Sequence, residues 1–143
     1  MSDTFYLDIS SIQPTQLYIS DLKYQIVNEK LSRERFTHEL YNPIPIKQFD
    51  GEIIFIDGHT RAAWLVNHGV YTVKVYWEKE EYNWDLYRRC IQWCKEENIN
   101  SMDDLKGKII SSKEYEKLWN KRCNIALQEI RRSRKVENGN RGI

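Results

Sequence analysis

A five-residue segment, Asp57-Gly58-His59-Thr60-Arg61, brings together the groups in this chain that are best suited to bind an anion. It follows an apolar, strand-like run and opens an apolar, helix-like run. A strand that ends in Asp-Gly and turns directly into a helix leaves backbone N–H groups unpaired at the helix start. Because a histidine and an arginine stand beside these N–H groups, the segment predicts a phosphate site.

The same residues supply two of the three requirements of phosphoryl transfer: donors for the phosphate oxygens and a metal ligand. We expect the Thr60 hydroxyl, the Arg61 guanidinium, His59 and the backbone N–H groups from Gly58 onward to hold phosphate oxygens. Asp57 is the expected ligand of Mg²⁺. The third requirement is a group that orients or deprotonates the attacking hydroxyl, and Asp57 is the first candidate. Asp57 and His59 are therefore the candidate catalytic residues.

Each residue of the segment also has a purely structural interpretation. Asp57 followed by Gly58 is typical of a bare turn before a helix, and Thr60 is a good N-cap residue. In the same interpretation His59 bonds to a carbonyl, and Arg61 pairs with Asp57 at the surface. The complete pentapeptide between a strand and a helix favours the phosphate site. Other carboxylates that are candidates for the base lie in an ambiguous stretch: Glu29, Glu34 and Glu39.

The elements that must position this segment follow from the spacing of apolar residues. Ser20 is a candidate N-cap, two prolines exclude a helix near residue 44, and Asp50-Gly51 predicts a hairpin turn. Gly69 predicts a helix end. The predicted elements are strands at 5–9, 43–46, 53–56 and 71–77, and helices at 21–31 and 60–68.

From residue 83 onward the apolar period changes from two to about 3.6, which predicts two further helices. Ser111 and Glu114 resemble a capping box at the start of the second one. The expected organisation is an α/β domain at 1–80, a helical extension packed on it at 81–130, and a basic, disordered tail at 131–143. The fold class is α+β.

Composition limits the classes of protein that remain. The chain has 143 residues, 41% of them apolar and 30% charged, and a net charge of +1, which is typical of one globular domain. No run approaches the roughly 20 apolar residues that cross a membrane, and no basic and apolar leader follows Met1. We expect a cytosolic protein without a membrane partner. Its three cysteines favour buried free thiols over zinc, which would need two more ligands.

The basic excess of the C-terminal part comes from one cluster: Arg131, Arg132, Arg134, Lys135 and Arg141. A cluster of this kind is able to bind DNA, but a solvated tail is the favoured interpretation.

A wider pattern around the pentapeptide resembles the N-terminal domain of the ParB and sulfiredoxin superfamily, over about residues 5–77. The resemblance implies a small mixed sheet with helices and a nucleotide at the turn. It is carried by Ile12-x-Pro14, a helix, Pro43-Ile44-Pro45-Ile46, Gly51-x-x-x-x-Ile56-Asp57-Gly58-His59-Thr60-Arg61-Ala62-Ala63 and a strand after Gly69.

The branches of this superfamily differ at the turn. ParB proteins have a Gly-Glu-Arg-Arg box that binds CTP and a following helix-turn-helix domain; here His59 replaces the glutamate and no clear helix-turn-helix follows. Sulfiredoxins use a cysteine at the position of His59, so thiolate chemistry is excluded here. Free serine kinases have Asp-Gly-His-His-Arg, which differs only at Thr60. Their catalytic glutamate follows the first Ile-x-Pro, where this chain has Gln16.

The sequence therefore predicts a nucleotide-binding protein that uses Mg²⁺ with ATP, ADP or CTP. The resemblance to serine kinases implies phosphoryl transfer to a small hydroxyl compound, or nucleotide hydrolysis. The alternative is a non-catalytic, ParB-like module that binds a nucleotide, DNA or a protein partner.

Overall fold

The computed structural model describes residues 3–141, and side chains as far as residue 135. A four-stranded mixed sheet has the order β1-β5-β3-β4, in which only β5 and β3 run parallel. The α+β class is confirmed. The strands and the longer helices are β1 Thr4–Asp8, β2 Ile19–Ser20, α1 Asp21–Lys30, β3 Ile44–Phe49, β4 Glu52–Phe55, α2 His59–Asn67, β5 Thr72–Trp77, α3 Trp84–Glu96, β6 Ile109–Ile110, α4 Ser112–Tyr115 and α5 Lys121–Arg141.

The hairpin of β3 and β4 forms at the turn that the sequence predicts. Asp50 and Gly51 both have positive φ angles, 49° and 83°, which match the twist of two antiparallel strands joined by a short turn. Gln13 covers the outer edge of β4, because its N–H donates to Ile53 and its carbonyl accepts from Phe55. This contact brings the segment after Gln13 to the end of β4, where the anion-site turn begins.

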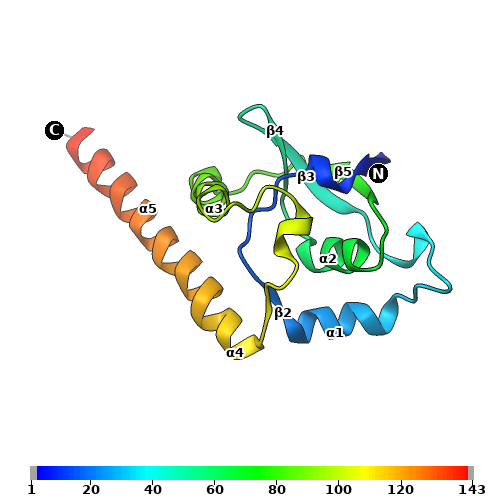
Figure 1. Ribbon diagram of the computed structural model, residues 1–143. Coiled ribbons are helices and arrows are strands. Elements are labelled where there is room, and N and C mark those ends of the chain that lie inside the picture. The colour runs from blue at the N-terminus through cyan, green and yellow to red at the C-terminus, as the bar shows by residue number, and fades with distance from the viewer. Residues whose placement is uncertain (1–2, 142–143) are drawn as a thin grey trace.

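The core lies between the sheet and α2, and α1 lies beyond α2 (Figure 1). Ile44 and Ile46 of β3 and Val73 and Val75 of β5 are fully buried in one cluster with Trp64 of α2. Strand β5 does not alternate strictly between buried and exposed residues, because Val73, Lys74 and Val75 are buried in succession and Trp77 is 41% exposed. The buried face of α2 anchors its first residues against the sheet.

The apolar residues of α1 and its C-cap, Leu22, Ile26, Val27 and Leu31, are not all buried. Leu31 is buried, whereas Leu22 is 54% and Ile26 47% exposed. Only one edge of α1 packs on the body, so part of this apolar set faces outward. The ambiguous stretch that follows is a loop with one 3-10 turn, His38–Leu40.

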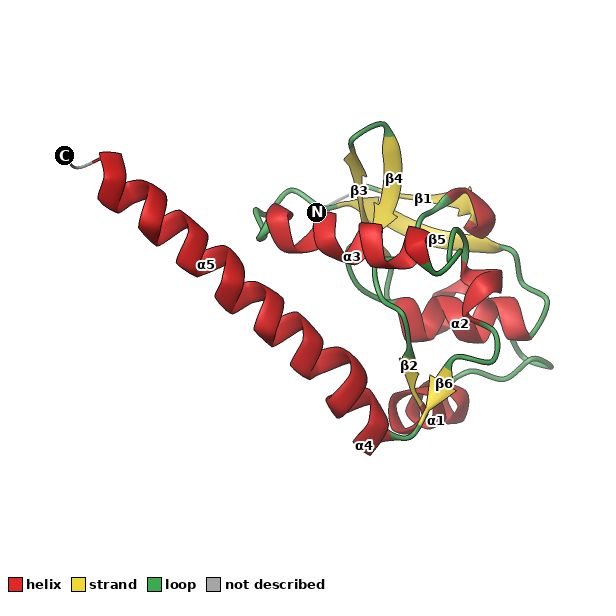
Figure 2. Cartoon of the chain, turned by 60° about the vertical axis from the view of Figure 1, so that its left-hand side comes forward, coloured by secondary structure: helices red, strands yellow, loops and turns green. Residues whose placement is uncertain are grey.

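The helical C-terminal part shares the core of the sheet. Ile91 of α3 packs with Ile54 and Ile56, and β6 pairs with β2. Helix α4, a π-helical turn at Glu116–Asn120 and α5 follow one another without a break. Residues 131–141, expected in a disordered tail, instead continue α5 (Figure 2), and Arg134 within them pairs with Asp85 of α3. Residues 142 and 143 of that tail lie outside the described part of the chain.

The sequence also predicts buried free cysteines and no membrane-spanning segment. Cys90 and Cys94 are buried free thiols, and Cys123 is half-buried. Within residues 3–141, no helix combines the length and the apolarity that crossing a membrane requires.

Candidate anion site at the start of helix α2

Gly58 makes the turn from β4 into α2 and is its N-cap residue. Its φ angle of 82° lies in the left-handed region, which glycine adopts without the steric penalty of a Cβ atom. A Cβ at this position would lie 2.8 Å from Cγ2 of Ile44 and 3.0 Å from a guanidinium nitrogen of Arg61. Both the backbone angle and the close packing therefore require glycine. Thr60, an alternative N-cap by sequence, is instead the second residue of the helix.

The first backbone N–H groups of α2 are free to bind a ligand. The first bond of the helix joins the N–H of Ala62 to the carbonyl of Gly58, at 3.0 Å. The N–H groups of His59, Thr60 and Arg61 have no hydrogen-bond partner among the described residues. Together with the partial positive charge of a helix start, these free N–H groups fit the predicted anion site.

His59 is held in one orientation beside these N–H groups. It is 3% exposed, and its Nε2 accepts a hydrogen bond from the backbone N–H of Thr15 at 2.9 Å. An acceptor Nε2 carries no proton, so the proton of the neutral ring is on Nδ1. The hydroxyl of Thr15 donates to the carbonyl of Phe55 and stabilises this arrangement.

The Nδ1–H of His59 is a buried donor without a partner in the described part of the protein. Burial lowers the pKa of His59 to about 3, and the nearby carboxylate of Asp57 opposes this shift. The ring is therefore neutral near pH 7. Its expected bond to a carbonyl is absent among the described residues, and a buried unpaired N–H costs about 1–3 kcal/mol unless a ligand accepts from it.

Arg61 lies over the same turn and is oriented by the loop before β3. One guanidinium nitrogen donates to the carbonyl of Asn42 at 2.6 Å. Another is the nitrogen that lies close to Gly58. Burial lowers the pKa of Arg61, and the carboxylate of Asp57 opposes this shift. The surface pair with Asp57 does not form: within residues 3–135, Arg61 takes part in no ion pair.

Asp57 is exposed, and among the described side chains its carboxylate makes no hydrogen bond or ion pair. No group of three or more His, Cys, Asp or Glu residues able to hold a metal occurs in the described part of the chain. A Mg²⁺ ion that is bound by one carboxylate, phosphate oxygens and water does not need such a group. Asp57 therefore fits a metal that arrives with a nucleotide.

A cavity of about 270 Å³ joins the predicted residues to groups from distant segments. Gln16 lines it from the loop before β2, Lys23 from α1 and Tyr115 from α4, beside all five residues of 57–61. The amide nitrogen of Gln16 donates to the hydroxyl of Tyr115 at 3.3 Å, and Lys23 lies over the ring of Tyr115. Sequence reasoning missed Lys23 and Tyr115, which carry no local signal. The candidate bases Glu29, Glu34 and Glu39 do not line the cavity.

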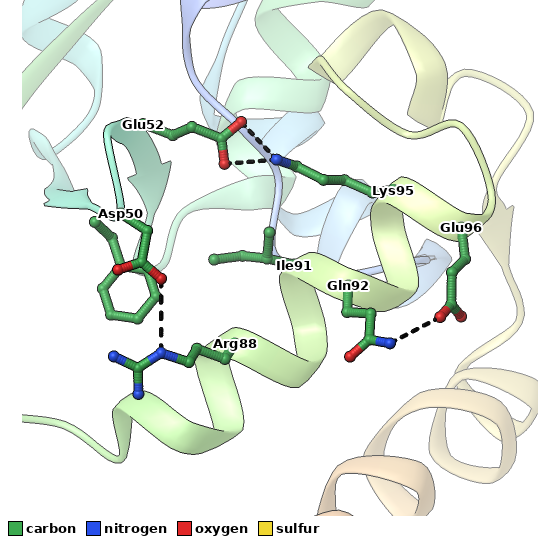
Figure 3. A pocket seen from close by; sticks show the side chains of 8 residues that line it. Asp50, Glu52, Arg88, Ile91, Gln92, Lys95 and Glu96 are labelled. Atoms are coloured by element: carbon green, nitrogen blue, oxygen red, sulfur yellow. Dashed lines mark hydrogen bonds and ion pairs between the residues drawn. The ribbon is translucent and has the colours of Figure 1, made fainter.

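A second cavity, of about 700 Å³, lies between the β3–β4 turn and α3 (Figure 3). Its charged groups are paired with one another. Lys95 binds Glu52 at 2.7 Å, Arg88 lies 3.6 Å from Asp50, and Gln92 donates to Glu96. This cavity presents no buried donor that lacks a partner.

Comparisons with known proteins assign no family. No protein-family model matches the chain, and no curated protein matches it. Among solved structures, protein Atu1540 from Agrobacterium tumefaciens matches with 15% sequence identity and a TM-score of 0.43. The match covers 72% of this chain and 61% of that protein. A likeness of this degree carries no argument about function.

Proposed function

We propose that the protein binds a nucleotide through its terminal phosphates at the start of α2. The observation that carries this proposal is the buried, unpartnered Nδ1–H of His59 beside the free N–H groups of α2. Phosphate oxygens are acceptors that would satisfy donors of this kind. Arg61 and Lys23 supply positive charge to the same cavity.

For catalysis, the proposal is transfer of a phosphoryl group to a small hydroxyl compound, or hydrolysis of the nucleotide. Bound Mg²⁺ would neutralise phosphate charge, and Asp57 is the residue that would hold it. Neutral His59 donates a hydrogen bond and does not act as a base. Asp57 is then the candidate that accepts the proton of the attacking hydroxyl, and Thr60 and Arg61 hold the phosphate in place.

A second candidate function is nucleotide binding without turnover, and Gln16 favours it. The Gln16 side chain lies in the cavity where a carboxylate base would be useful, and an amide does not accept a proton near neutral pH. In this case the protein would be a nucleotide-dependent module.

A thermal-shift screen tests binding first. ATP, ADP and CTP, each with and without Mg²⁺, are added to the intact protein at rising concentration. Ligand at a hundredfold its Kd should stabilise the protein by about 2.7 kcal/mol. We expect one of the three to raise Tm, and Arg61→Ala to lose that shift while Arg88→Ala, in the second cavity, retains it. If none of the three raises Tm, the proposal is wrong.

Turnover then separates the two candidates. The nucleotide that binds is incubated with Mg²⁺ alone and with hydroxylated amino acids, and phosphorylated products are measured. If the protein is a kinase or a hydrolase, the wild type should form product. The Asp57→Asn variant should form none while it still binds the nucleotide. Binding without product in any mixture favours the non-catalytic module.

A further inference from the structure

The charges of α5 are divided between two sides of the helix. On the side facing α3, Arg134 pairs with Asp85 and Glu129 pairs with Arg89, each at 2.5 Å. Arg122 stacks on the ring of Trp93, 4.2 Å from its centre. The charged groups that face the body are thus occupied by contacts within the protein.

The opposite side of α5, which we term the α5 basic face, has no such partners. Its cations make no ion pair with any described residue, and every side chain in it is exposed. Two amides lie between the cations and add further hydrogen-bond donors. The α5 basic face comprises Lys121, Asn124, Gln128, Arg131, Arg132 and Lys135.

We propose that the α5 basic face binds the phosphate backbone of duplex nucleic acid, without sequence preference. Helical geometry puts Lys121 and Lys135 about 21 Å apart along one straight axis. A duplex carries one negative charge per roughly 1.7 Å of its axis, so a row of cations on this scale meets several phosphates at once. The helical conformation, in place of a disordered tail, is what aligns these cations.

Three other kinds of partner match the surface less well. Single strands are bound on stacked aromatic rings, and the α5 basic face contains none. A membrane-surface helix inserts an apolar face, but among its described residues α5 has one exposed large apolar side chain, Ile125, and Ala126 and Ile130 are buried against the body. An acidic protein would offer carboxylates without the regular spacing of a phosphate backbone. The net charge of +1 means that the local arrangement, and not overall charge, would drive binding.

The test is fluorescence anisotropy of the intact protein with a labelled 20-base-pair duplex of mixed sequence, in 50 mM salt. The variant removes Lys121, Arg131 and Lys135 by substitution with Ala, which preserves helix propensity. The matched control removes Arg33, Arg35 and Lys79, which are also exposed and unpaired among the described residues, and therefore loses the same net charge.

We expect the full chain to bind, and the triple variant to bind at least tenfold more weakly while the control changes less than twofold. The slope of log K against log salt should fall in magnitude by about 2.7 in the triple variant, at roughly 0.9 per lost phosphate contact. Three outcomes overturn the proposal: no binding by the full chain, equal weakening in both variants, or stronger competition by polyglutamate or anionic vesicles than by unlabelled duplex. Nucleotide binding at α2 is measured separately, so either proposal can fail alone.

Discussion

The two cavities at opposite ends of β4 differ in whether their polar groups have hydrogen-bond or ion-pair partners. The cavity between the hairpin turn and α3 is the larger, but its lysine, arginine and carboxylates satisfy one another. The cavity at α2 is smaller; it is lined by residues 57–61, whose N–H groups at the helix start lack partners, and the Nδ1–H of its lining residue His59 is buried without a partner. Unsatisfied donors, more than volume, therefore favour the cavity at α2 as the proposed ligand site.

The polar groups of the two cavities also differ in how far they are exposed to solvent. The Lys95–Glu52 pair has side chains that are 46% and 38% exposed, so water screens the pair and lowers its value. His59 is 3% exposed, and its unpaired N–H is shielded from water that would otherwise satisfy it. A buried polar group without a partner is costly, and this supports the ligand that we propose at this helix start.

The largest expected effect is the pH dependence that His59 confers on stability. The unfolded chain protonates this histidine as the pH falls below about 6.5, whereas the folded protein resists protonation until about pH 3. Its contribution is therefore complete above pH 6.5 and is lost progressively as the pH falls toward 3. The loss is up to about 1.4 kcal/mol per pH unit.

Urea unfolding at pH 7.0, 6.0 and 5.0 measures this dependence in the wild type and in His59→Gln. The carboxylates that also titrate in this range are the same in both proteins. The free energy of unfolding of the variant should fall less steeply between pH 6.5 and 5 than that of the wild type. NMR titration of the wild type gives an independent reading if the variant does not fold. A His59 ring that titrates near pH 6.5 in the folded protein would contradict the burial of this site.

Gly58→Ala should have the next largest effect. It places a side chain at a φ angle of 82° and within 2.8 Å of Ile44, and we expect destabilisation of about 2–4 kcal/mol. Gly51→Ala, in the hairpin turn that borders the second cavity, is the matched control. Its φ angle is 83°, and a Cβ at this position would have no atom within 4 Å. Only the cost of the left-handed backbone conformation, about 1–2 kcal/mol, therefore remains. Equal destabilisation in urea would show that packing against Ile44 is unimportant.

Arg61→Ala should weaken nucleotide binding about 10- to 100-fold, as expected for a hydrogen bond to a charged group worth about 1.5–3 kcal/mol. Isothermal titration with the nucleotide that binds best gives this ratio directly. Arg88→Ala makes the same change in the second cavity and should leave Kd within twofold. A similar loss of nucleotide affinity in both variants would contradict the assignment of the nucleotide to the cavity at α2.

The smallest effect is expected for the ion pair of the larger cavity. Lys95→Ala should cost at most about 1 kcal/mol, because both partners are substantially exposed. Thermal unfolding in low and high salt measures the loss, which should shrink as salt screens the pair. A cost above 2 kcal/mol, or a lost nucleotide shift, would mean that the second cavity also contributes to function.

The sequence alone determined the local parts of the site. The Asp-Gly turn after an apolar strand and the helix that follows it are short-range features, so the pentapeptide was predicted at the start of α2. The hairpin at Asp50-Gly51 and the helix end before Gly69 were predicted for the same reason. Local φ preferences and apolar spacing act over a few residues and can be read without the fold.

Only the tertiary structure determined which polar groups of these residues are left without a hydrogen-bond partner. Thr15 is 44 residues from His59, and only the fold brings its N–H to Nε2 and so leaves Nδ1–H as the free donor. Lys23 and Tyr115 reach the cavity from separate helices. The local pattern also did not show that residues 131–141 continue α5 in place of a solvated tail; in the fold, Arg134 pairs with Asp85 of α3. Burial and hydrogen-bond satisfaction are properties of segments far apart in the chain, so no local pattern specifies them.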